Sequence, residues 1–133
     1  MELLKRRQED TGMSMILITH DLGLVAYMAD RVLVMYAGKI IEQAKASELF
    51  KSPRHPYTRA LLETVPTIRD DADRKLFSIP GIVPENYDHI KGCRFADRCA
   101  YRRPECEKPQ EEYPFGQEHT ARCIVSMEGG IPE

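Results

Sequence analysis

The chain has 133 residues, of which 42% are hydrophobic and 30% are charged, and its formal net charge is −2. This length holds one ordinary domain or two small ones, and the composition is that of a globular protein. A net charge near zero gives no electrostatic reason to expect a nucleic acid or an anionic membrane as a partner. No apolar stretch approaches the roughly 20 residues of a membrane-spanning helix, and the charged N-terminus has no signal-peptide core, so we expect a cytoplasmic protein.

The first predicted elements are a helix, a buried strand and a second helix. Residues 2–11 are predicted to be helical up to Gly12, because glycine is common just past a helix C-terminus. An unbroken apolar run predicts a strand over residues 14–19 that is buried on both faces, as in a parallel sheet. Asp21 is a candidate N-cap for a helix over residues 21–29. The expected core face of that helix contains Leu22, Val25, Ala26 and Ala29.

His20 lies at the polar end of the predicted strand, immediately before the second helix. In open α/β sheets, the junction between a strand and the following helix is where ligands are bound. Spacing alone nevertheless favours a solvated loop residue over a histidine that contacts a ligand.

A β-hairpin and two further helices are predicted next. Residues 31–36 are rich in β-branched and aromatic side chains, and a tight turn at Ala37-Gly38 leads into a second strand over residues 39–43. A short helix follows over residues 46–51. Another helix is predicted to begin at Pro56, because proline is favoured at the first helical position. Its apolar face contains Tyr57, Ala60, Leu61 and Val65, and Pro66 ends it.

Residues 44–84 contain His55 and two predicted connections. His55 is expected to cap or pack locally rather than to bind a ligand. Residues 67–75 are predicted to be a charged, solvated linker. Residues 78–84 contain two prolines and a glycine, so they are expected to be extended with a turn.

The four cysteines, Cys93, Cys99, Cys106 and Cys123, have the spacing C-x5-C-x6-C-x16-C. Prolines and a glycine break this window into turns, and it has too few apolar residues to order itself by burial alone. Four thiolates around one metal centre would hold it together. Disulfides are disfavoured in a reducing compartment. Zinc normally uses close C-x2-4-C pairs, which are missing here, so zinc and an iron–sulfur cluster fit the spacing about equally.

Several stretches of the sequence resemble the ATP-binding subunits of ABC transporters. These stretches are residues 16–22, 29–32 and 34–40. The motif His55-Pro56-Tyr57, residues 78–84 and the four cysteines resemble the extension that follows the ATPase domain in oligopeptide and dipeptide importers. The cysteine match also includes Gly92, Phe95, Arg98 and residues 119–123.

The resemblance implies roles for particular residues. It implies that His20 is the switch histidine, which reaches the γ-phosphate of ATP in an intact subunit that also binds Mg²⁺. It implies that Cys93, Cys99, Cys106 and Cys123 hold a [4Fe-4S] cluster, with zinc as the alternative metal. For His119, a surface or supporting role is favoured over the role of a replacement ligand.

The resemblance also implies an α/β fold in three parts. Residues 1–45 are expected to be the strand–helix–hairpin end of an ABC ATPase domain, and residues 46–90 a helical and extended linker. Residues 91–128 are expected to form a small, irregular cysteine-rich domain. The implied role is in the ATPase subunit that couples ATP hydrolysis to peptide import. Its implied partners are permease subunits and a sister ATPase subunit, at the inner face of the bacterial inner membrane.

Three further expectations concern the chain by itself. No phosphate loop of the form G-x-x-x-x-G-K-[ST] occurs in these 133 residues, so we expect no ATP hydrolysis by this chain alone. The bare edge of the predicted strand at 14–19 favours pairing with another copy, so we expect a homo-oligomer. The alternative function is a stand-alone structural-metal module without an ATPase role, in which the cysteine segment docks a partner.

Overall fold

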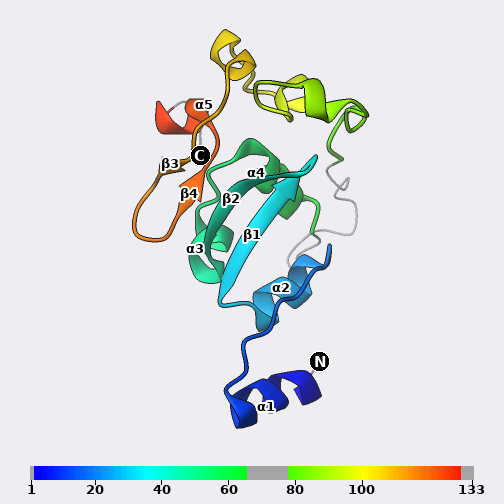
Figure 1. Ribbon diagram of the computed structural model, residues 1–133, viewed down its shortest axis with the longest axis vertical. Coiled ribbons are helices and arrows are strands. Elements are labelled where there is room, and N and C mark those ends of the chain that lie inside the picture. Colours follow the sequence, from blue (N-terminus) through cyan, green and yellow to red (C-terminus); the bar gives the residue numbers. More distant parts are fainter. Residues whose placement is uncertain (1, 66–77, 130–133) are drawn as a thin grey trace, which may run out of the picture.

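The computed structural model describes residues 2–65 and 78–129, which form helices around an antiparallel sheet (Figure 1). The described helices are α1 (Glu2–Thr11), α2 (Leu22–Met28), α3 (Ala46–Lys51), α4 (Pro56–Glu63) and α5 (Ile124–Met127). The strands are β1 (Arg31–Tyr36), β2 (Lys39–Lys45), β3 (Tyr113–Pro114) and β4 (Thr120–Ala121). Three 3₁₀ turns are η1 (Tyr87–His89), η2 (Ala96–Arg98) and η3 (Pro104–Glu107). None of the described helices is long and apolar enough to cross a membrane.

The β1–β2 hairpin confirms the prediction for this part of the chain. Its turn has φ values of 44° at Ala37 and 79° at Gly38, the left-handed values that a tight two-residue hairpin turn requires. Alternate residues of β1 are buried, so one face of the hairpin packs on the core and the other faces outward. β2 continues to Lys45, two residues beyond the predicted end of the strand.

The far end of the chain completes the sheet. The strand order is β1-β2-β4-β3, and β4 pairs antiparallel with β2, with Glu42 opposite Ala121. Next to this pair, the Arg122 N–H donates to the Ile41 carbonyl at 2.8 Å. Main-chain hydrogen bonds therefore fasten the cysteine-containing segment directly to the hairpin.

An aromatic cluster joins the same two parts of the chain through their side chains. The Phe95 ring is 3% exposed, and its centroid lies 5.3 Å from those of both Tyr36 and Tyr57. It also lies 6.0 Å from the centroid of the His55 ring. Phe95 thus packs the turn after Cys93 against β1 and α4.

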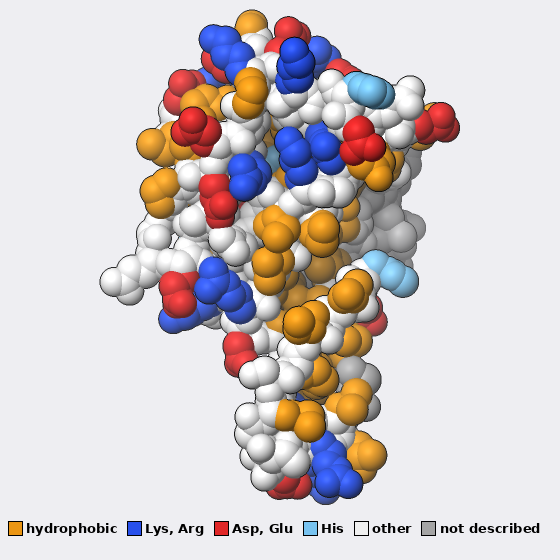
Figure 2. Space-filling view, viewed as in Figure 1, with side chains coloured by type: hydrophobic (Ala, Val, Ile, Leu, Met, Phe, Trp, Pro, Cys, Tyr) orange, Lys and Arg blue, Asp and Glu red, His pale blue; other side chains and the backbone are white. Residues whose placement is uncertain are grey.

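The strand predicted for residues 14–19 is not formed, so this part of the fold prediction is wrong. The segment pairs with no strand among the described residues, and Ile16 and Ile18 are 91% and 94% exposed. A strand forms only where a neighbour accepts and donates its backbone hydrogen bonds, and the described chain supplies no neighbour here. Figure 2 shows hydrophobic side chains running from the central body down along this N-terminal part.

The helix predictions are confirmed in position, with one error about the core. Asp21 caps α2, because its Oδ1 atom accepts from the Leu24 N–H at 3.0 Å. Val25 and Ala29 pack on the core as expected, but Ala26 is exposed and Met28 is buried instead. Ala29 is the C-cap residue, and its backbone is extended rather than helical. The face that this short helix buries therefore differs from the predicted one, with Met28 in place of Ala26.

The two predicted connections after α4 have different outcomes. Residues 67–75 lie outside the described residues. Residues 78–84 form no helix or strand and bend at Gly81, whose φ is 81°, as predicted.

Candidate metal centre

The four cysteines lie close together at the end of the sheet where the 3₁₀ turns gather. All four are free thiols; Cys106 and Cys123 are buried, and Cys93 and Cys99 are half-buried. A negative charge on any one of the four sulfurs would repel a negative charge on each of the other three. Every pair of thiols is therefore close enough for a charge on one to act on the other.

Burial favours the protonated form of three of the four thiols. Burial raises the pKa of the Cys93 thiol to about 12, and the neighbouring thiols push the pKa in the same direction. Burial likewise raises the pKa of Cys99 and of Cys123. Four negative sulfurs in this space therefore need a positive centre between them, which metal ions supply.

Each sulfur is approached by at least one backbone N–H group from its own turn. The donors are Phe95 for Cys93, Tyr101 for Cys99 at 3.4 Å, Arg103 for Cys106 at 3.5 Å, and Val125 and Ser126 for Cys123. A neutral thiol is a weak acceptor, so these donors gain most when the sulfur carries negative charge. Hydrogen bonds of this kind tune the potential of iron–sulfur clusters, and they suit a set of thiolate ligands.

A close backbone approach at Gly92 brings the first and third cysteines together. The Cys93 N–H donates to the Cys106 carbonyl at 2.8 Å. A Cβ atom at position 92 would lie 2.3 Å from that carbonyl oxygen and 2.7 Å from the carbonyl of Glu107. Only glycine leaves room for this contact.

We predict that Gly92→Ala separates these two backbone segments. The expected loss is about 2–4 kcal/mol in the free energy of unfolding, from overpacking and one lost hydrogen bond. Urea unfolding measures the loss, and hydrogen exchange at the Cys93 amide locates it. Gly23→Ala is the matched control, because the nearest atom to its added Cβ is the Asp21 side-chain oxygen at 3.3 Å. A Gly92→Ala chain as stable as the control would contradict the role of this contact.

The described residues contain no group of three or more His, Cys, Asp or Glu side chains that could hold a metal ion. A zinc ion binds sulfur at about 2.3 Å, so its ligand sulfurs must nearly touch one another. A four-iron cluster is a larger body and is held by four thiolates that stand further apart. Four cysteine sulfurs with N–H groups beside them are donor types that suit either a zinc ion or an iron–sulfur cluster.

The five arginines near the cysteines contact oxygen atoms and aromatic rings. Arg98 is the best-connected: it donates to the carbonyls of Pro80 at 2.8 Å and Ile79 at 3.1 Å, and to the Tyr36 hydroxyl at 3.2 Å. The other four likewise bond to carbonyl or carboxylate oxygens; they are Arg94, Arg102, Arg103 and Arg122. These arginines hold the turns in place around the thiols.

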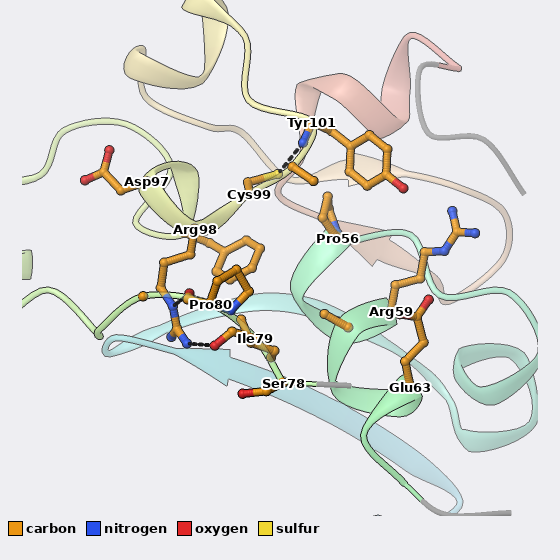
Figure 3. Close-up of a pocket in the computed structure, with 14 residues that line it drawn as sticks. Pro56, Arg59, Glu63, Ser78, Ile79, Pro80, Asp97, Arg98, Cys99 and Tyr101 are labelled. Carbon is orange, nitrogen blue, oxygen red and sulfur yellow. Dashed lines mark hydrogen bonds between the residues drawn. The ribbon is translucent and has the colours of Figure 1, made fainter. Parts of the chain in front are cut away.

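A groove of about 660 Å³ opens beside Cys99 (Figure 3). Pro56 and α4 line one side, and Ile79 and Pro80 line another. Cys99 and Tyr101 come from the turn that follows η2. Of the four thiols, Cys99 is therefore the one that lines this groove.

A buried carboxylate on β2, Glu42, is a residue that no sequence pattern indicates. Glu42 is 1% exposed, and its Oε1 atom accepts from the Arg54 N–H at 2.6 Å and contacts His119 Nε2 at 2.8 Å. Its Oε2 atom accepts from the His55 N–H at 2.8 Å. Because a carboxylate only accepts, His119 Nε2 carries a proton in this contact. No local pattern indicates this arrangement, since the partners are 12, 13 and 77 residues away.

His55 has the capping and packing role predicted for it. Its Nδ1 atom accepts from the Tyr57 N–H at 3.1 Å and so caps α4. The ring is 1% exposed, and burial lowers the pKa of the His55 imidazole to about 3. The unfolded chain therefore takes up a proton near pH 6.5, whereas the folded chain does not.

We predict that this difference destabilises the fold in acid. The contribution of neutral His55 is complete above about pH 6.5 and is lost as the pH falls towards 3, because the unfolded state then binds the extra proton. Between about pH 7 and pH 5 the expected loss from this residue is about 2 kcal/mol. His55→Asn keeps an acceptor at the cap and does not titrate, so its stability should fall less over this range. An equal loss of unfolding free energy in the wild-type and His55→Asn chains, measured by urea unfolding, would contradict this prediction.

His20 lies apart from the cysteines. It is exposed, at a bend immediately before Asp21 and α2. In Figure 1 α1 lies at the lower end of the molecule, whereas residues 85–110 lie at the upper end. His20 is not among the groups that act on Cys93, Cys99 or Cys123.

Comparison with known proteins identifies the family. Residues 41–106 match the family described as the oligopeptide/dipeptide transporter, C-terminal region. A putative peptide import ATP-binding protein of Brucella melitensis is 46% identical over 123 residues, which are 92% of this chain and 37% of that protein. The dipeptide transport ATP-binding protein DppD of Haemophilus influenzae is 46% identical over 133 residues, 99% of this chain and 40% of that protein. The chain belongs to the oligopeptide/dipeptide transporter family.

The chain spans about two fifths of the length of these transporter relatives. The region that matches the transporter family contains Glu42, His55 and three of the cysteines. His119 and Cys123 lie beyond it, although β4 ties them to the sheet.

Proposed function

We propose that this chain works within the ATP-binding subunit of a peptide importer, where ATP hydrolysis drives peptide uptake through a permease. The supporting observation is the 46% identity to peptide import and dipeptide transport ATP-binding proteins over nearly the whole chain. Residues 1–45 then belong to the nucleotide-binding domain, 46–90 to the linker and 91–128 to the cysteine-rich extension. The partners are permease subunits and a sister ATP-binding subunit at the cytoplasmic face of the membrane.

His20 is the residue proposed to contact the γ-phosphate of ATP in the complete subunit. Its exposed position leaves the ring open to contact, and the Asp21 cap fixes the backbone next to it. In the organism that encodes the protein, His20→Ala is expected to abolish uptake of a labelled dipeptide without changing the amount of protein. His89→Ala, also at an exposed histidine, is the control. Full uptake by the His20→Ala strain would overturn the assignment.

The 133-residue chain by itself is expected not to hydrolyse ATP. Its own sequence supplies neither the backbone cradle nor the lysine of a phosphate loop, and one histidine does not replace them. A phosphate-release assay on the purified chain tests this expectation. Turnover above background that disappears in His20→Ala would contradict it.

The four cysteines are proposed to hold a [4Fe-4S] cluster, with zinc as the alternative metal. Support comes from the mutual approach of all four thiols and from the N–H donors at each sulfur. When bound, the cluster supplies a rigid cross-link between the turns at η2, η3 and α5. Protein purified without oxygen is expected to contain about four iron and four sulfide per chain. About one zinc per chain and no sulfide would favour zinc, and neither metal would overturn the proposal.

We also predict that the isolated chain associates with a second copy. The exposed side chains of Ile16, Ile18, Leu33 and Met35 offer an apolar surface. The outer edge of β1, which pairs with no other strand among the described residues, offers free backbone groups. Light scattering at micromolar concentration should report at least twice the mass of one chain. Ile18→Lys should lower that mass. A monomeric wild-type chain would exclude this association.

A further inference from the structure

The last cysteine reaches the metal centre from a part of the chain remote from the other three. Cys93, Cys99 and Cys106 follow one another through η2 and η3, whereas Cys123 comes after β4 and begins α5. Its position relative to the other thiols therefore depends on how β4 and α5 are held against the rest of the fold.

The Glu42 carboxylate holds the chain on both sides of Cys123. Before the cysteine, His119 Nε2 contacts Glu42 Oε1 at 2.8 Å, at the start of β4. After the cysteine, the Ser126 hydroxyl donates to the Arg54 carbonyl, and the N–H of the same Arg54 donates to Glu42 Oε1 at 2.6 Å. The segment before Cys123 and the segment after it are thus both linked to the Glu42 carboxylate, the first directly and the second through Arg54.

The same carboxylate also reaches the side of the centre that carries Cys93. Glu42 Oε2 accepts from the His55 N–H at 2.8 Å, and the His55 ring packs 6.0 Å from Phe95. The backbone N–H of Phe95 is the donor that approaches Cys93. Glu42 therefore connects both ends of the cysteine set, although it lies on β2 and outside that set.

We infer that Glu42, acting through His119, is the positioning residue that places Cys123 for metal binding. The inference rests on the proposed function for its metal readout, but the placement of Cys123 can be tested in the metal-free chain. His119 is 4% exposed, and its side chain touches Glu42 and none of the thiols by hydrogen bond. Replacing His119 with alanine therefore removes the contact that holds the chain before Cys123, but leaves all four cysteines in place.

The first readout is the alkylation of each thiol by a maleimide in the metal-free chain, followed by mass spectrometry. In His119→Ala, Cys123 is expected to react at least about tenfold faster, because a lost hydrogen bond to a charged group shifts a local equilibrium by that factor or more. Cys106, which is also buried, should keep its wild-type rate. His119→Gln should largely restore the slow rate of Cys123, since its amide N–H can donate to Glu42.

The matched control is Glu112→Ala, which removes a carboxylate that contacts the same strand from its exposed side. Glu112 accepts from Thr120, Gln43 and Arg122, but does not reach the buried network. Its variant should show wild-type rates at Cys123. Equal acceleration in both variants, or a uniform rise at all four thiols, would overturn the inference.

The second readout is iron retained by the anaerobically loaded chain after exposure to a chelator. His119→Ala should retain at least about tenfold less iron than wild type, the usual effect of losing a residue that orients a ligand. Circular dichroism shows whether each variant is folded. If wild type binds no iron but Cys123 is selectively exposed in His119→Ala, the proposed metal centre is contradicted and the placement of Cys123 by Glu42 and His119 stands. Wild-type thiol rates in His119→Ala would defeat the inference alone.

Discussion

Replacing Glu42 with glutamine is expected to lower the free energy of unfolding by about 3–5 kcal/mol, the range for removing one partner of a buried charged network. The carboxylate accepts three hydrogen bonds, from the N–H groups of Arg54 and His55 and from His119. An amide has one accepting oxygen and one donating nitrogen. In either orientation at least one buried N–H then faces another donor, which leaves both unsatisfied.

The size of this effect is large for a chain of this length, since domains are stable by only about 5–15 kcal/mol. Urea unfolding of the metal-free chain measures it directly. Glu112→Gln is the control, because the Glu112 side chain is 37% exposed and pairs with Arg122 at the surface. Such pairs contribute at most about 1 kcal/mol. A Glu42→Gln chain within 1 kcal/mol of wild type would show that the buried network is not what holds β4 to the hairpin.

Replacing Cys93 with serine is expected to give the largest loss of metal. The Cys93 thiol interacts electrostatically with the other three thiols, and its N–H donates to the Cys106 carbonyl. A serine hydroxyl is not deprotonated at neutral pH and is a poor ligand for iron or zinc, both of which bind thiolate. Retained metal should therefore fall by at least about tenfold.

Metal content should be measured beside thermal unfolding, because metal binding and folding are coupled in a segment with so few apolar residues. The stabilisation that metal confers on wild type should be absent in Cys93→Ser. Ala100→Ser is the control, since it adds a hydroxyl at an exposed position in the same turn and removes no thiol. Wild-type metal content in Cys93→Ser would remove Cys93 from the ligand set.

The parts of the fold that sequence predicts well are those with a local cause. Asp21 caps α2, Pro56 begins α4, and Ala37-Gly38 turns the hairpin, each through contacts within a few residues. The helices and the hairpin therefore lie where the patterns indicate. That the four cysteines share one metal centre stays a prediction.

The errors and omissions have non-local causes. The run around Ile16 and Ile18 has the composition of a buried strand, but composition supplies no partner, and the described chain leaves both side chains exposed. Glu42 looks like an ordinary charged residue of a strand. Its importance comes from His119, which is 77 residues away, and no spacing rule reaches so far.

The pairing of β4 with β2 makes the early hairpin and the late cysteine segment one cooperative unit. A chain cut after Cys106, where the match to the transporter family ends, would retain three thiols but lose β4 and His119. It would expose the free edge of β2 and leave the Glu42 carboxylate short of a buried partner. The segment that completes this sheet therefore extends beyond the residues that match the transporter family, and its pairing requires the closure of a long loop, which slows folding.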